Sequence, residues 1–147
     1  MISGRGEGFT LVELVIVVFI IALLLSIGLP AYQKQLMTMR RSLAGAELRE
    51  VRIRQEQYFL DYKNYPESLK EIGYPASPYA IDSEGNALAP MDGNRIYLIN
   101  LTTHRLAYTL LAVPQFGQVD DRMCGTLSLK SSGIKLQTGT GTMEDCW

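Results

Sequence analysis

The 147-residue sequence has few of the residues from which catalytic and metal sites are usually built. It contains one histidine, His104, and two cysteines, Cys124 and Cys146. This supply is too small for a zinc site of the usual kind, and no nucleophile and base are grouped into a catalytic set. The glycines form no phosphate-binding loop. The sequence therefore predicts a protein that is not an enzyme and that holds no cofactor or metal ion.

Two acidic stretches remain as candidate metal ligands. They are DSEGN, residues 82–86, and the pair Asp120 and Asp121. Calcium prefers oxygen ligands of this type, but neither stretch has the spacing of a known calcium-binding loop. We therefore predict no calcium site. We also expect His104 to be a solvated side chain at the end of a strand.

The sequence also lacks an excess of positive charge. Its 14 basic and 15 acidic residues give a formal net charge of −1. Nucleic-acid-binding domains usually carry a strong basic excess, and electrostatic tails carry long blocks of one sign. Neither feature is present, so the overall charge does not indicate a nucleic-acid-binding protein.

The two cysteines allow a single disulfide. Cys124 and Cys146 have 21 residues between them. Outside the cytoplasm an even pair is typical of a disulfide, whereas in a reducing compartment both residues would be buried free thiols. A disulfide closing a loop of this size stabilises the folded state by roughly 3 kcal/mol in the chain-entropy model.

One long run near the N-terminus has no charge at all, from Leu14 to Leu29. The 19 residues from Leu11 to Leu29 would form about 28 Å of helix, which matches the hydrocarbon thickness of a bilayer. A secretory signal peptide is the alternative, but it needs a basic start, a shorter apolar region and a small-residue cleavage site after that region. Here the small residues Gly6 and Gly8 precede the run. We therefore predict a membrane-spanning helix.

The helix is expected to continue beyond this run. Gly28 and Pro30 favour a kink or a locally melted segment, because proline removes a backbone donor and crowds the preceding turn. Residues 32–62 contain no proline and one glycine, Gly45. They carry an apolar stripe at helical spacing, and charged residues on the opposite face. The stripe consists of Ala44, Leu48, Val51, Tyr58 and Tyr62, widened by Phe59, and the opposite face of Arg40, Glu47, Arg54 and Asp61. The pattern predicts one helix of about 50 residues, whose second half packs on a globular domain.

The remaining residues predict an α+β fold. The stretch from Pro66 to Gly73 favours one or two short helical turns, and residues 75–94 have the composition of a loop. Four strand-like runs follow, at residues 95–102, 106–114, 124–131 and 134–138. We therefore expect a four-stranded antiparallel sheet laid across the long helix.

The N-terminal residues resemble those of a type IV prepilin. A short leader ends in Gly8, Phe9 and TLVEL follow, and the apolar helix has a proline near its end. The resemblance implies that a membrane-embedded prepilin peptidase cuts between Gly8 and Phe9 and N-methylates Phe9. It divides the chain into a leader, residues 1–8, a transmembrane and assembly helix, residues 9–30, and a soluble pilin domain, residues 31–147.

The resemblance also implies a role for Glu13 and Pro30 in assembly. A carboxylate buried in apolar surroundings needs a partner. The new α-amine of Phe9, in the same chain or in a neighbour, would supply one and draw each subunit into register. The alternative is that Glu13 is an acid that snorkels to the membrane surface.

The same resemblance implies where the chain resides. It places the leader in the cytoplasm, the single-pass helix in the inner membrane and the soluble domain in the periplasm, before the subunit enters an extracellular pilus. Lys34, Arg40 and Arg41 follow the apolar run, and Arg5 is the only basic residue of the leader. Counting positive charges would favour the reverse orientation. We follow the prepilin resemblance.

Later segments narrow the resemblance to PilE-type minor pilins. These segments are YFLDYKNYPESLKEIGY, YTLLAVPQFGQVDDRMCGTLSLKSSGIK and the terminal DCW. Pilins similar to these include a competence pilin that binds DNA. The resemblance implies a disulfide between Cys124 and Cys146 that fastens the last strand and the tail to the sheet.

These features favour a minor pilin that helps to initiate type IV pilus assembly and is incorporated into the filament, which serves adhesion and twitching motility. Its expected partners are other major and minor pilins, the prepilin peptidase, the inner-membrane assembly platform and the membrane itself. A type II secretion pseudopilin is one alternative, although the disulfide and the tail argue for the pilus. A DNA-uptake pilin is the other. It is disfavoured because residues 124–146 hold Lys130 and Lys135 against Glu144 and Asp145.

Overall fold

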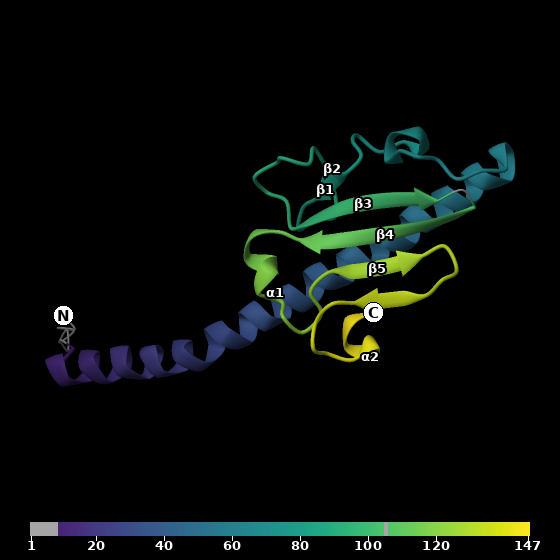
Figure 1. Ribbon diagram of the computed structural model, residues 1–147. Coiled ribbons are helices and arrows are strands. Elements are labelled where there is room, and N and C mark those ends of the chain that lie inside the picture. Colours follow the sequence, from purple (N-terminus) through teal and green to yellow (C-terminus); the bar gives the residue numbers. More distant parts are fainter. Residues whose placement is uncertain (1–8, 105) are drawn as a thin grey trace, which may run out of the picture. The chain divides into compact units, whose positions relative to one another are not determined.

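The computed structural model describes residues 9–104 and 106–147, and these form two compact units (Figure 1). The first unit ends at Leu36, and the second runs from Met37 to Trp147. Helix α1, Leu11–Tyr62, contributes to both units and has 52 residues. It is helical through Gly28 and Pro30. A locally melted segment is therefore wrong, because proline removes a single hydrogen-bond donor and the helix continues on both sides of it.

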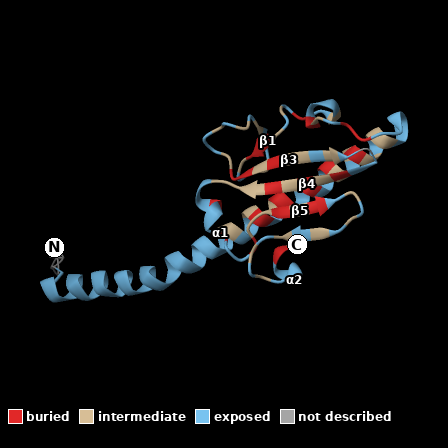
Figure 2. Cartoon of the chain, viewed as in Figure 1, coloured by how far each residue is buried: buried red, intermediate tan, exposed pale blue. Residues whose placement is uncertain are grey.

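Within the second unit, α1 buries one face against the sheet. Ala44, Leu48 and Val51 are fully buried, as their spacing predicts. Tyr62 is 64% exposed, so the predicted stripe extends too far along the helix. Figure 2 shows this change along α1, whose last turns are largely exposed. Tyr62 instead packs against Tyr58 in a tilted arrangement, with ring centroids 4.4 Å apart.

The sheet has six antiparallel strands in the described part of the chain, not four. Its order is β2-β1-β3-β4-β5-β6. The strands are β1 (Tyr79–Ile81), β2 (Ala87–Leu88), β3 (Tyr97–His104), β4 (Ala107–Pro114), β5 (Leu127–Lys130) and β6 (Lys135–Gln137). The four predicted strands correspond to β3, β4, β5 and β6. The predicted loop at residues 75–94 is therefore partly wrong, because it contains β1 and β2.

Strands β1 and β2 have no local pattern that would reveal them. All three residues of β1 are buried, so they do not alternate, and β2 has only two residues. The pairing that defines β1 is non-local, since Tyr79 lies opposite Ile99 of β3. Tertiary pairing rather than local propensity therefore makes these residues extended.

Short helical segments connect and close the sheet. The 3-10 helix η1, Leu69–Ile72, begins at a capping box formed by Ser68 and Glu71 and ends at Gly73, as predicted. The 3-10 helix η2, Phe116–Asp120, follows β4. Helix α2, Met143–Cys146, directly precedes Trp147. The core lies between α1 and the sheet and is dominated by fully buried residues of the strands, including Tyr79, Tyr97, Ile99, Leu110 and Leu127.

Candidate functional site

The apolar part of α1 presents one acidic side chain. An 18-residue window of the helix has a mean hydropathy of 3.0, and none of it is buried within the structure. Its length and composition suit a membrane span. Glu13 lies in the first turn, where its backbone N–H donates to Oγ1 of Thr10 at 3.2 Å. Among the described residues, the Glu13 carboxylate has no hydrogen bond or ion pair.

Phe9 lies two residues before the start of α1 and is 78% exposed. It lies four residues before Glu13 along the chain. Gly8 and the rest of the predicted leader lie outside the described residues. Cleavage between Gly8 and Phe9 therefore stays a prediction.

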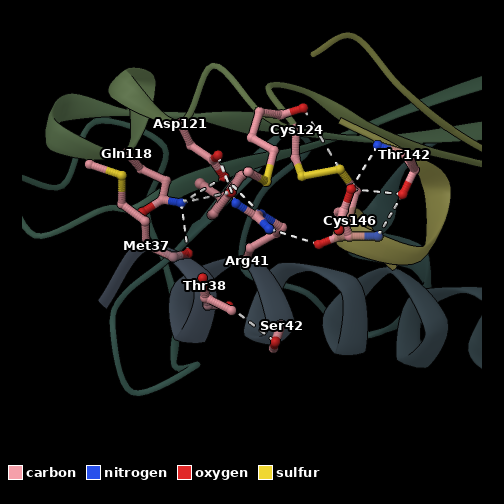
Figure 3. A network of polar contacts seen from close by, with 12 residues as sticks. Met37, Thr38, Arg41, Ser42, Gln118, Asp121, Cys124, Thr142 and Cys146 are labelled. Carbon is pink, nitrogen blue, oxygen red and sulfur yellow. Dashed lines mark hydrogen bonds and ion pairs between the residues drawn. A yellow bond between two sulfur atoms is a disulfide. The ribbon is translucent and has the colours of Figure 1, made fainter. Parts of the chain in front are cut away.

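A ring of polar and covalent contacts fastens the C-terminal tail to α1 (Figure 3). Cys124 and Cys146 form the predicted disulfide, with their Cα atoms 5.5 Å apart. Arg41 donates from Nε and Nη2 to the two carboxylate oxygens of Asp121, at 2.8 and 2.7 Å. Its Nη1 donates to the backbone carbonyl of Asp145 at 2.8 Å. Because Asp121 precedes Cys124 by three residues and Asp145 precedes Cys146, the contacts close on themselves.

The centre of this ring is buried. The side chains of Arg41 and Asp121 are 8% and 3% exposed. A buried ion pair is costly to dehydrate, and a bidentate geometry with further hydrogen bonds offsets that cost. Gln118 of η2 adds such bonds, since its Nε2 donates to the backbone carbonyl of Met37 and to the hydroxyl of Tyr97, both at 3.1 Å. The ring therefore fixes η2 and the tail to the first residues of the second unit.

A second feature is a basic surface around the C-terminal tryptophan. The indole Nε1 of Trp147 donates to the backbone carbonyl of Leu136 in β6 at 3.1 Å. Lys135 places its Nζ 5.4 Å from the centre of the indole ring. From α1, the Arg49 guanidinium approaches the same region, since it and the Trp147 ring both lie within 3.9 Å of a Cβ built on Gly45.

Arg52 extends this surface along α1. Its guanidinium lies against the β5–β6 turn, where a Cβ on Gly133 would be 3.1 Å from Nη1. We call Arg49, Arg52, Lys135 and Trp147 the Trp147 basic surface. Within the part of the chain that the structure describes, none of its three cations takes part in an ion pair. A hollow of about 270 Å³ adjoins it, between α1 and the tail.

Counting charges along the sequence missed this surface. Residues 124–146 hold two lysines against Glu144 and Asp145, which balance. The fold adds Arg49 and Arg52 from α1 to the region of Lys135 and Trp147. Hydrogen bonds from the Thr142 side chain and backbone lower the pKa of Asp145. No periodicity near residue 140 could have indicated arginines that lie about 90 residues earlier.

The remaining candidate residues have structural surroundings. Oδ1 of Asp82 accepts the backbone N–H groups of Glu84 and Asn86, each at 2.9 Å, so this acidic stretch is folded on itself. His104 is exposed at the end of β3. Burial raises the pKa of Tyr74 and of Tyr97 to about 12, and both phenols belong to the packed interior.

Comparisons with known proteins agree with this geometry. Residues 5–29 match a family model described as the prokaryotic N-terminal methylation motif. Residues 30–128, more than half of the chain, match the model described as "Type IV minor pilin ComP, DNA uptake sequence receptor". The type IV major pilin protein PilA of Myxococcus xanthus (strain DK1622) is 36% identical over 72 residues. That alignment covers 49% of this chain and about a third, 33%, of the relative.

The boundary between the two family matches falls at the end of the apolar run. The first covers the whole apolar run, and the second covers the rest of α1 and the sheet as far as the start of β5. An exposed apolar helix leading into a helix packed on an antiparallel sheet is the α+β architecture expected from the prepilin resemblance. The chain belongs to the type IV pilin family and, within it, to the minor pilin type.

Proposed function

We propose that this protein is a minor pilin of a type IV pilus, which enters the filament as a structural subunit and helps to start its assembly. The observation that carries the proposal is the apolar part of α1, of which no residue in the most apolar window is buried. Covering one large apolar side chain is worth about 1.5–3 kcal/mol. The bilayer would cover this surface before assembly, and the helices of other pilins would cover it in the filament.

Glu13 would set the register in which a new subunit joins its neighbours. Its carboxylate has no partner among the described residues, and an unpaired charge in apolar surroundings costs several kcal/mol. Cleavage before Phe9 creates a positive α-amine four residues away. Pairing of Glu13 with that amine, or with the amine of a neighbouring subunit, removes the cost. The pairing favours one register of adjacent helices, as assembly at the base of a filament requires.

The proposal is tested by replacing Glu13 and counting subunits in sheared filaments. Glu13→Gln keeps the shape of the side chain and removes its charge, and Glu13→Ala removes both. We expect both variants to be cleaved normally and to reach the membrane at wild-type level, but to enter filaments at about a tenth of that level, corresponding to about 1.4 kcal/mol of lost attraction. Wild-type incorporation of both variants would overturn the pairing argument.

Processing is tested separately by intact mass. Gly8→Leu should leave the chain uncleaved, because the peptidase must admit the backbone before Phe9. The wild-type chain should begin with N-methylated Phe9 only in cells that contain the prepilin peptidase. The proposed cleavage site also defines the three parts of the chain and their orientation. The leader lies in the cytoplasm, residues 9–30 form the transmembrane and assembly helix, and residues 31–147 form the soluble domain in the periplasm. Cleavage of the Gly8→Leu variant would contradict the proposed site.

A type II secretion pseudopilin is the alternative within the same architecture. The disulfide and the fastened tail support the pilus. Deleting the gene separates the two functions, because loss of a minor pilin should reduce filament number and twitching motility. Loss of exoprotein secretion with filaments intact would instead assign the chain to the secretion system.

A role in DNA uptake is the second candidate function. It is favoured by the match of residues 30–128 to a model described as a DNA uptake sequence receptor, and by the Trp147 basic surface. Arginine and lysine side chains bind phosphates, and an indole ring stacks on bases. The zero balance of residues 124–146 no longer argues against this function, because α1 supplies two more cations to the same surface.

The DNA-binding hypothesis makes a prediction about salt. The full chain in detergent is titrated with duplex DNA at several salt concentrations. Each phosphate contact that is lost should reduce the slope of log affinity against log salt by about 0.9. We expect R49Q, R52Q and K135Q each to reduce the slope, and K70Q, on the exposed 3-10 helix η1, to leave it unchanged. Equal slopes for all four variants would refute a role for this surface.

A further inference from the structure

The segment formed by η2 and the residues after it carries exposed apolar side chains beside arginines. Phe116 is 56% exposed, Val119 is 58% exposed and Met123 is 50% exposed. The Arg95 guanidinium lies over the Phe116 ring, 4.5 Å from its centre. Phe116 also has a φ of 46°, in the left-handed region that bulky residues rarely adopt. The backbone is therefore held in an unfavourable conformation where this ring meets solvent.

A polar hollow of about 220 Å³ lies beside the same ring. Arg40 of α1 and Arg95 both line it. Arg95 donates from Nε to Oε1 of Gln115 at 3.1 Å and from Nη1 to the backbone carbonyl of Asp92 at 2.7 Å. The Nε of Arg40 is buried and has no hydrogen-bond partner in the structure. A buried donor without a partner is costly, so an anion in the hollow would be stabilised there.

The connection of this segment to α1 limits its distance from the apolar run. Gln118 donates to the backbone carbonyl of Met37, and Asp121 pairs with Arg41. Met37 follows Leu29, the last residue of the apolar run, by eight residues, which even a fully extended chain spans in about 29 Å at most. The length of the chain therefore allows the segment to reach the surface of a bilayer that holds the run.

The η2 segment therefore presents exposed apolar side chains and arginines on one surface. Aromatic and aliphatic side chains next to arginines are typical of segments that lie in the interface of a bilayer, where the rings enter the acyl boundary and the guanidinium groups bind lipid phosphates. Asp121 is paired with Arg41 and is left out of the charge count. The other charged side chains near the segment have a net charge of +1. The surplus counts Arg40, Arg95 and Arg122 against Asp92 and Asp120.

We propose that η2 is a second membrane contact of the unassembled pilin: Phe116 and Val119 enter the bilayer interface, and Arg40 and Arg95 hold the phosphate of an anionic phospholipid. This proposal rests on the apolar part of α1 lying in a membrane before assembly. The contact holds the second unit at the lipid surface until assembly removes the subunit from the bilayer.

Quenching of tryptophan fluorescence by brominated lipids tests the contact in the full chain. F116W is placed in vesicles of phosphatidylcholine with phosphatidylglycerol whose acyl chains are brominated near the headgroup. The wild-type chain, with Trp147 as its single tryptophan, gives the background signal. We expect F116W to lose about half of its added fluorescence, as for a ring at the acyl boundary. L106W, which replaces a residue that is 70% exposed beyond β3, is the matched control and should lose none.

A third position separates the two proposals. I20W lies in the middle of the apolar run and should be quenched by deeply brominated lipids whenever α1 is inserted. Quenching of I20W without quenching of F116W would overturn the second contact and leave the pilin function intact. No quenching of I20W would instead refute the membrane segment of the proposed function.

The arginines are tested by changing the lipid charge. In F116W, quenching should be stronger with phosphatidylglycerol present than in phosphatidylcholine alone. The added substitutions R40Q and R95Q should remove that difference. Equal quenching of F116W in both lipids would overturn the binding of an anionic headgroup.

Discussion

The buried ion pair of Arg41 and Asp121 gives the sharpest test of how the second unit is held together. Asp121→Asn keeps the shape of the side chain and removes its charge. Arg41 then stays 92% covered (its side chain is 8% exposed) without a counter-ion. Its one other hydrogen bond, to the backbone carbonyl of Asp145, does not neutralise it. Removing one member of such a pair typically costs about 3–5 kcal/mol.

The expected effect is large enough for thermal unfolding to resolve. In a unit of this size, about 4 °C of melting temperature corresponds to 1 kcal/mol, so D121N should melt about 12–20 °C below the wild type. The assay is circular dichroism of the full chain in detergent, followed at a wavelength sensitive to the sheet. E50Q is the matched control, because it breaks the exposed pair of Glu50 with Arg54 at 3.1 Å. That loss should cost less than about 1 kcal/mol.

A double variant distinguishes the stranded charge from lost packing. R41M with D121L removes both charges and fills the space with apolar groups, and it should recover most of the stability lost in D121N. If D121N melts within about 4 °C of the wild type, equivalent to 1 kcal/mol, the pair is not the structural link described above. Equal loss in D121N and in the double variant would assign the effect to shape and refute the electrostatic argument.

Two further predictions concern the tail and the phenols. Replacing Cys124 and Cys146 together by serine should lower the free energy of unfolding by roughly 3 kcal/mol, measured by denaturant titration; a wild-type chain whose midpoint is unaffected by reductant would contradict this. Burial raises the pKa of Tyr74 and of Tyr97 from 10.0 to about 12. Their contribution to stability is therefore fully present below pH 10 and is lost as the pH rises toward 12, because the unfolded chain releases the phenolic protons first. Y97F should flatten this alkaline loss in a pH series of melting temperatures, and phenolate absorbance that rises fully near pH 10 without unfolding would refute the assignment.

The sequence predicted those parts of the fold whose burial repeats with a regular period. Tyr97 and Ile99 in β3, and Tyr108 and Leu110 in β4, alternate because one face of the sheet meets α1. The same argument predicted the buried stripe of the helix as far as Val51 and failed at Tyr62, where the sheet no longer covers the helix. A periodic apolar pattern identifies a helix face that can be buried. The extent of the sheet that packs on this face decides how much of it is buried.

The polar features could not be predicted in this way. Arg41 is buried, and its partner Asp121 lies 80 residues later. Arg40, which was predicted on the face opposite the apolar stripe, is only half-exposed and lines the hollow beside Phe116. The Trp147 basic surface likewise joins Arg49 to Lys135 across the fold. An ion pair or a shared surface between distant residues leaves no local pattern, so these features became visible only in three dimensions.

The ring that joins Arg41, Asp121, the disulfide and Asp145 also determines how a mechanical force passes through the subunit. A pull applied along α1 enters the second unit at Met37, and Arg41 lies just over one helical turn beyond that point. The bidentate pair and the bond to Asp145 pass the force at once to η2 and to the tail, and the disulfide joins those two segments covalently. The contacts near the start of the helix are therefore strained together, in shear, so the helix resists being peeled from the sheet one residue at a time. In a subunit built in this way, tension that enters along the helix is shared by the sheet and the tail from the first contacts of the second unit.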